Sequence, residues 1–257
     1  MLLKNKLISL IIMTFLLSVS TFTSAEEKKN DGLARVILIK AKQGKENDLE
    51  KAIIKHHKFM GKKEGALRFQ WFRVETGPDT GSYFARTGGH NWADFDAKHD
   101  WDESEGKYFQ KHVAKYVESA QASLTQTDDE LGIWPESLKD YEYFQLTRWH
   151  IKSGKNEEFN DGLKKIDAML KKSNWPNYYS FVYTVSGGHG NTVLLVSPKK
   201  NFADMAPKEP KFMDLLKKEM GDDKASEFLK NWGTSYKTGD YFMIRYLPKQ
   251  SDYGDSE

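Results

Sequence analysis

The chain has 257 residues, with 39 basic and 37 acidic side chains and a formal net charge of +2. This near-neutral composition is typical of a globular protein and argues against a strongly basic nucleic-acid binder. The sequence contains no cysteine, which excludes disulfides, thiolate metal sites and a cysteine nucleophile. The length favours two domains over one.

Residues 1–25 have the layout of a secretory signal peptide. Lys4 and Lys6 precede an apolar run from Leu7 to Leu17, and a stretch of small and polar residues ends at Ala25, the expected cleavage position. The apolar run is shorter than the about 20 residues of a membrane-spanning helix, so a retained anchor is the weaker alternative. We therefore expect a periplasmic or secreted protein that does not associate with a membrane after cleavage.

The sequence resembles itself when it is shifted by 110 positions. Gly44-Lys45 aligns with Gly154-Lys155, and residues 91–95 align with residues 201–205. One offset that satisfies matches spread over most of each half indicates a duplicated unit of domain size.

Each half carries the same pattern of predicted elements. A β-rich strand ends at a glycine turn, an amphipathic helix follows, two strands are joined by a Gly-rich link, and a helical region precedes a last strand. The expected strands are 34–41, 68–75, 82–87 and 131–134 in the first half, and 143–151, 178–185, 192–197 and 241–247 in the second. Asn91 and Asn201 are expected N-caps, with Asp94 and Asp204 three residues later.

The predicted fold class is α+β. We expect two tandem ferredoxin-like βαββαβ repeats whose antiparallel sheets pack as an intramolecular α+β barrel. The first repeat would span 33–136 and the second 141–248, and 249–257 is expected to be a disordered tail.

The start of each repeat resembles a known family. Gln43-Gly44-Lys45-Glu46-Asn47-Asp48 and its copy Ser153-Gly154-Lys155-Asn156-Glu157-Glu158 are similar to the strand–glycine–lysine–acidic helix start of the dimeric α+β barrel superfamily. That superfamily includes antibiotic-biosynthesis monooxygenase-like and NIPSNAP-like proteins. The resemblance implies a barrel and a range of chemistries, including cofactor-independent oxygenation, haem binding and no catalysis at all.

The histidines are the first candidates for chemistry. His56 falls among the apolar positions of its predicted helix, so it either packs between the helix and the sheet or acts as an acid/base group. His57 is expected to be solvated. His99 is surrounded by carboxylates, but their spacing matches no standard metal motif, so we expect a solvated acidic helix start.

The strands supply the other candidates. Alternation places Trp71, Arg73 and Glu75 on one face of their strand, and aromatic and arginine side chains recur on other strands. A barrel interior of this composition suits a small, flat, partly polar molecule. The alternative is a filled core in which the arginines pair with Glu75 or reach the rim. The candidate catalytic residues are His56, Glu75 and Arg73, and the candidate ligand-binding residues are Trp71, Trp149, Tyr183 and Arg245.

The sequence thus favours an exported barrel protein that binds a small organic molecule. One alternative is a cofactor-independent monooxygenase-like enzyme, with His56 or Glu75 as base and Arg73 and Trp149 as anion-stabilising donors. Another alternative is a non-catalytic assembly or partner-binding module with a solid barrel. We expect no cofactor, no metal and no nucleic-acid partner. The sequence leaves open whether the protein forms a homo-oligomer.

Overall fold

The structure is a computed structural model that describes residues 31–252. The expected signal peptide and residues 253–257 lie outside these residues. The first half contains β1 (Leu33–Ala41), α1 (Glu46–Met60), β2 (Gln70–Thr76), β3 (Tyr83–His90), α2 (Asp102–His112) and β4 (Val117–Ile133). The second half contains β5 (Tyr143–Ile151), α3 (Asn156–Lys172), β6 (Tyr179–Ser186), β7 (Thr192–Lys199), α4 (Phe212–Met220), α5 (Asp222–Gly233) and β8 (Tyr236–Tyr246).

The eight strands form one antiparallel sheet that closes on itself in the order β1-β3-β2-β8-β5-β7-β6-β4. The first-half strands are neighbours in the order β4-β1-β3-β2, and the second-half strands in the order β8-β5-β7-β6. The two sets meet at β2–β8 and at β4–β6. The predicted α+β class and antiparallel sheet are therefore confirmed, and closure of the sheet creates an enclosed inner face.

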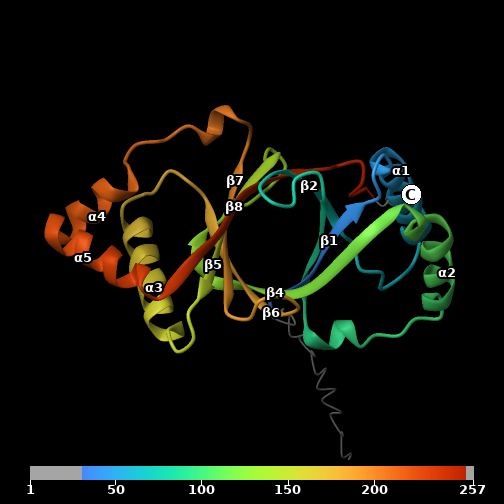
Figure 1. The fold of residues 1–257 in the computed structure, drawn as a ribbon, viewed down its shortest axis with the longest axis horizontal. Coiled ribbons are helices and arrows are strands. Elements are labelled where there is room, and N and C mark those ends of the chain that lie inside the picture. The colour runs from blue at the N-terminus through green and yellow to red at the C-terminus, as the bar shows by residue number, and fades with distance from the viewer. Residues whose placement is uncertain (1–30, 253–257) are drawn as a thin grey trace, which may run out of the picture.

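The helices lie on the outside of the barrel at two opposite ends of the molecule. Figure 1 shows α1 and α2 beside the first-half strands and α3, α4 and α5 beside the second-half strands. α1 buries Leu49, Ala52 and Ile53 toward its sheet, as the predicted apolar stripe requires. Among residues 31–252, no helix combines the length and apolar character needed to cross a bilayer.

The strand β4 corrects the predicted end of the first half. A helical region followed by a short strand at 131–134 was expected, but β4 runs for 17 residues from Val117 to Ile133. Its inner face carries Ser123, Thr125 and Thr127, so apolar alternation is missing and the strand is hard to recognise in the sequence. Pairing with β1 on one side and β6 on the other stabilises it instead.

The predicted caps are found, but on short elements. Asn91 and Asp94 form a reciprocal capping box, and Asn201 Oδ1 accepts the backbone N–H of Asp204 at 3.0 Å. Each pair lies at a 3₁₀ turn rather than at the main helix of its half. Asn91 is the N-cap of its turn, whereas Asn201 lies one residue before Phe202, the N-cap of the other.

The expected tail is partly fixed to the first half. Trp71 donates its backbone N–H to Ser251 Oγ at 2.8 Å, and Gln250 Nε2 donates to Glu50 Oε2 at 3.1 Å. Gln250 is buried, so residues 249–252 are ordered where a disordered tail was expected.

Candidate functional site

The barrel encloses a cavity of about 1050 Å³. This volume is near the upper end of the roughly 300–1,000 Å³ range of ligand pockets. The cavity is lined by residues from all eight strands, and exposed lining residues occur beyond both ends of β6: Gly187, Gly188 and His189 at one end and Trp134 at the other. A solid barrel core, the structural basis expected for a pure assembly module, is therefore not what the fold contains.

One wall of the cavity is apolar. It is built where β2, β8 and β5 adjoin, and its buried members form one hydrophobic cluster of Phe72, Val74, Phe144, Leu146, Phe242 and Ile244. Leu38, Phe84, Leu194 and Val196 extend this wall on the neighbouring strands. Because the wall offers aromatic and branched aliphatic surface without a polar group, it suits the apolar body of an organic molecule.

The opposite wall is polar and follows one register row. Gly88 of β3 lies opposite Ala34 of β1, Ala34 lies opposite Thr125 of β4, and Thr125 lies opposite Thr184 of β6. Tyr183, which precedes Thr184, pairs with Val193 of β7, and Val193 follows Thr192. Thr192 in turn is opposite His150 of β5. Hydroxyl groups and one imidazole therefore line up across four neighbouring strands.

Two arginines face the cavity, and their surroundings differ. Arg148 is neutralised by Asp240, whose Oδ2 lies 2.6 Å from Nη1, and its guanidinium lies over the ring of Phe242 at 5.2 Å. Arg86 forms no ion pair or hydrogen bond with any residue in the described range 31–252. Burial lowers the pKa of Arg86 because the charged form is removed from water.

His150 is positioned by its hydrogen bond to Thr192. The Thr192 hydroxyl donates to the carbonyl oxygen of His189 at 2.8 Å, so it accepts from His150 Nδ1–H at 3.1 Å. The neutral imidazole then carries its lone pair on Nε2. Burial lowers the pKa of His150, and the nearby His189 and Arg148 lower it further, so the ring is neutral at pH 7.

The seven predicted site residues do not line this cavity. The face that carries Trp71, Arg73 and Glu75 is the outer face of β2, and the inner face carries Phe72 and Val74. The same inversion applies to Trp149, Tyr183 and Arg245, whose neighbours on either side in sequence line the cavity or its apolar wall. The prediction therefore placed the wrong face of each of these strands inside the barrel. The physical reason is that helices cover the outer faces, so both faces of a strand are apolar and alternation does not identify the inner one.

Each member of the predicted catalytic trio pairs with a residue outside the trio. Arg73 Nη1 lies 3.6 Å from Glu50 Oε1 on α1, and Arg245 Nε donates to Glu75 Oε1 at 2.7 Å. The second contact matches the filled-core alternative in which an arginine pairs with Glu75, although it lies outside the barrel. His56 Nε2 is 2.8 Å from Glu105 Oε1 of α2.

Of the two neighbouring histidines, His57 departs from its expected solvated environment. His57 is the buried one, at 2% exposure, and its Nε2 accepts the indole N–H of Trp71 at 3.0 Å. Burial, together with the nearby His56, lowers the pKa of His57 to about 3, so it is a neutral core residue. His56 lies at the half-buried seam between α1 and α2.

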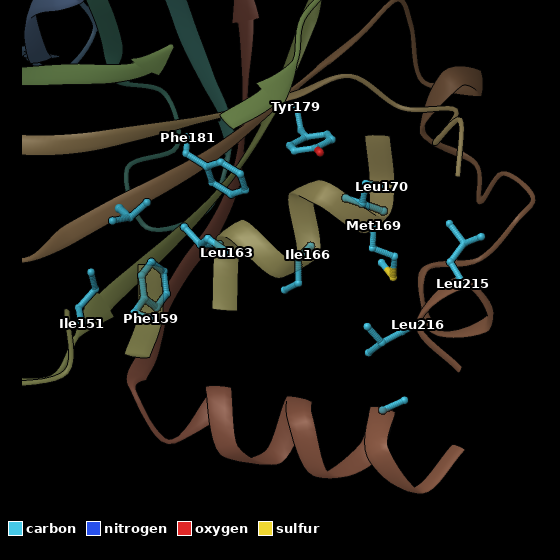
Figure 2. Close-up of a cluster of buried hydrophobic side chains, with 12 residues drawn as sticks. Ile151, Phe159, Leu163, Ile166, Met169, Leu170, Tyr179, Phe181, Leu215 and Leu216 are labelled. Atoms are coloured by element: carbon cyan, nitrogen blue, oxygen red, sulfur yellow. The ribbon is translucent and has the colours of Figure 1, made fainter. Parts of the chain in front are cut away.

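Trp149 and Tyr183 belong to the core between the second-half strands and helices. Trp149 contacts Phe159, Phe181 and Trp232, and the Tyr183 hydroxyl donates to Asn160 Oδ1 at 3.2 Å. Figure 2 shows Phe159, Phe181 and other members of this core around α3. Both residues thus pack a helix against the sheet.

His99 has a structural role in the described residues. Its ring stacks on Trp101 at a centroid distance of 4.5 Å and fills the space above Gly65. Within residues 31–252, no group of three or more His, Asp or Glu side chains is arranged to hold a metal ion.

Comparison with known proteins identifies a shared fold. No protein-family model matches the chain, and no curated protein matches its sequence. Similar solved structures include a candidate monooxygenase from Lactobacillus acidophilus, with a TM-score of 0.52 and 13% identity over 83% of this chain and 93% of that chain. An anthrone oxidase-like protein has a TM-score of 0.51 and 11% identity over 86% of this chain and 92% of that chain.

A mutant chlorite dismutase from Candidatus Nitrospira defluvii is similar to the same extent. Its TM-score is 0.51, with 8% identity over 86% of this chain and 93% of that chain. At these identities the likeness shows the fold alone, which is that of the monooxygenase-like and chlorite dismutase-like α+β proteins.

Proposed function

We propose that this protein binds a small organic molecule inside the barrel. The observation that carries the proposal is the cavity of about 1050 Å³ with an apolar wall facing a row of hydroxyl and imidazole groups. Side chains do not fill this interior, so the fold lacks packing contacts there that a bound molecule would supply.

A cavity-filling substitution tests this proposal. Val182 lines the cavity, whereas Val185 on the same strand is exposed on the outer face. We expect Val182→Trp to weaken binding of the fluorescent neutral probe 1-pyrenebutanol about tenfold or more, because the indole takes up ligand space. Val185→Trp, the matched control, is expected to bind like the wild type in the same fluorescence titration. Equal affinity in both variants would place the probe elsewhere and contradict the proposal.

We further propose that the chain is an exported product of a duplicated ferredoxin-like unit. Support for duplication comes from the element positions, since β5 begins 110 residues after β1 and α3 begins 110 residues after α1. Export rests on the signal-peptide pattern of residues 1–25. Native mass spectrometry of the purified protein reports both whether the chain starts at Glu26 and whether an organic molecule co-purifies. The NIPSNAP-like part of the resemblance stays a prediction.

A second candidate is a cofactor-independent oxygenase that uses His150 as its base. His150 lines the cavity with Nε2 unprotonated, and its orientation is held by Thr192. This version replaces the base and donors expected from the sequence, because Arg73 and Trp149 do not share a cavity. The base would remove a proton from an acidic carbon, and the resulting carbanion would react with dioxygen.

Dioxygen uptake in the presence of anthrone, an acidic polycyclic ketone, tests this second candidate. We expect His150→Gln to lower kcat/KM roughly 100-fold or more, as for loss of a general base. His90→Gln is the matched control, since His90 Nε2 is also held by a threonine hydroxyl, Thr87 Oγ1 at 2.7 Å, but it does not line the cavity. Because the pKa of His150 is lowered, the rate should fall with acid only below the ordinary histidine value of 6.5. Uptake that is equal in the two variants would contradict a role for His150.

A further inference from the structure

The inner face contains a cation that the described part of the protein leaves without a counter-charge. Arg86 lies on β3, between Gln70 of β2 and Val36 of β1 in the register, and its side chain lines the cavity. Arg148, the other arginine in the cavity, is paired with Asp240. Arg86 is half-buried, and a guanidinium that is partly withdrawn from water without a partner is unfavourable.

The carboxylates that line the cavity do not serve Arg86. Asp128 Oδ1 accepts the backbone N–H groups of Glu130 and Leu131, both at 3.0 Å. Asp79 and Asp129 also line the cavity, and neither lies within ion-pair distance of Arg86 in the described structure. The counter-charge is therefore missing from the lining residues themselves.

The strand makes room for the guanidinium at Gly88. A Cβ atom at this position would lie 2.5 Å from Nη1 and 2.8 Å from Cζ of Arg86. The backbone of Gly88 does not adopt a positive φ, so glycine is not needed there for conformation. The missing side chain instead leaves room for the guanidinium against the backbone of Gly88.

A second unpaired polar group lies on that same row. Thr125 is 4% exposed, and its Oγ1 has no hydrogen-bond partner in the described structure. Ala34, a small residue, separates it from Gly88. The planar cation therefore lies beside the aromatic wall, because Phe84, two residues before Arg86, pairs with Phe72 of β2.

We propose that the ligand of this barrel is an organic carboxylate with an apolar body, bound with its carboxylate on Arg86 and its body against the aromatic wall. A guanidinium and a carboxylate match in shape and can form two parallel hydrogen bonds. This inference rests on the proposed function and specifies the chemical class of the ligand at the same site.

The test compares two probes that differ in their head group, 1-pyrenebutyrate and 1-pyrenebutanol, by fluorescence titration of the purified protein. The wild type should bind the carboxylate at least about tenfold more tightly than the alcohol, as for a charge-assisted hydrogen bond. Arg86→Met should abolish this preference and leave the affinity for the alcohol unchanged. Arg35→Met is the matched control, since Arg35 is exposed on the neighbouring strand, and it should keep the preference.

Two further measurements separate loss of the ion pair from loss of the fold. Gly88→Ala keeps the charge but displaces the guanidinium, so it should reduce the preference for the carboxylate. Arg86→Met should leave the thermal unfolding midpoint of the ligand-free protein equal or higher, because it removes a half-buried charge that has no partner. A lower midpoint would show that Arg86 serves the fold and would count against the inference.

The outcomes distinguish this inference from the proposed function. Equal binding of both probes by the wild type, unchanged in Arg86→Met and weakened in Val182→Trp, would overturn the carboxylate inference and leave small-molecule binding standing. Failure of the wild type to bind either probe would count against the proposed function and this inference together.

Discussion

Replacing Asp167 by alanine should lower the free energy of unfolding by about 3 kcal/mol, since each buried group left unsatisfied costs about 1–3 kcal/mol. Asp167 lies on α3 at 4% exposure. Its Oδ1 accepts the Tyr179 hydroxyl at 2.9 Å and the backbone N–H of Gly132 at 2.8 Å. One carboxylate therefore connects a helix to two strands of the barrel, β6 and β4.

The substitution should destabilise the structure most where the pairing of β4 is irregular. The pairing of β4 with β6 shifts register between Thr127 and Gly132, and the Gly132 backbone has φ of 116°. A side chain at Gly132 would meet the Tyr179 carbonyl oxygen at 2.6 Å, so the close approach needs glycine. Without Asp167, the N–H of Gly132 and the hydroxyl of Tyr179 would both be buried without this acceptor.

Thermal and urea unfolding followed by circular dichroism measure this effect. A loss of about 3 kcal/mol corresponds to a fall of roughly 6–12 °C in Tm for a domain of this size. Asp161→Ala on the same helix is the matched control, because Asp161 is exposed. Asp167→Asn keeps an oxygen acceptor and should cost less than Asp167→Ala. If Asp167→Ala were no less stable than Asp161→Ala, the proposed role of this network would be wrong.

Substituting Gly162 by alanine should destabilise the protein by about 2 kcal/mol, although the same change within an exposed helix usually stabilises by about 0.5–1 kcal/mol. Gly162 is buried on α3 beneath Trp232 of α5. An added Cβ would overlap the indole ring at Cδ1 and Nε1 and would lie 2.8 Å from its Cγ. Trp232 also donates its indole N–H to the carbonyl oxygen of Phe159 at 3.0 Å, so moving the ring breaks this bond as well.

Gly106 provides a control of opposite sign. It lies within α2, and a Cβ there would meet no atom within 4 Å. Gly106→Ala should therefore raise the unfolding free energy by about 0.5–1 kcal/mol. Near-ultraviolet circular dichroism should change in Gly162→Ala, where the aromatic cluster around Trp232 must shift, and stay unchanged in Gly106→Ala. If Gly162→Ala were more stable than the wild type, the packing of the Trp232 indole would not require glycine at position 162.

Much of the local structure could be predicted from the sequence. The strand at 143–151 and the amphipathic helices after each glycine turn were identified correctly, because their periodicity and turn residues are local properties. The capping pairs at Asn91 and Asn201 were also found, since a cap involves residues only three apart. β4 escaped prediction because its polar inner face removes the pattern by which a half-buried strand is recognised.

The site itself required the tertiary structure. Arg73 and Arg86 look alike in sequence, as polar residues within apolar strands, but Arg73 lies outside beside Glu50 and Arg86 lies inside without a partner. One signal was present in the Gly-rich sequence at 88–89, where a glycine in a strand indicates a close approach by another group. The sequence alone does not identify the group that approaches Gly88.

The sequence by itself determined the α+β class, the order of the main elements and the helix-covered character of the strands, because these follow from periodicity and turn chemistry within short windows. Only the tertiary structure decided which face of each strand is enclosed, because helices cover the outside while strand pairing across β2–β8 and β4–β6 closes the inside. That closure brings Arg86, Thr125 and His150 to one cavity from three strands, and sends the predicted residues to the outer face.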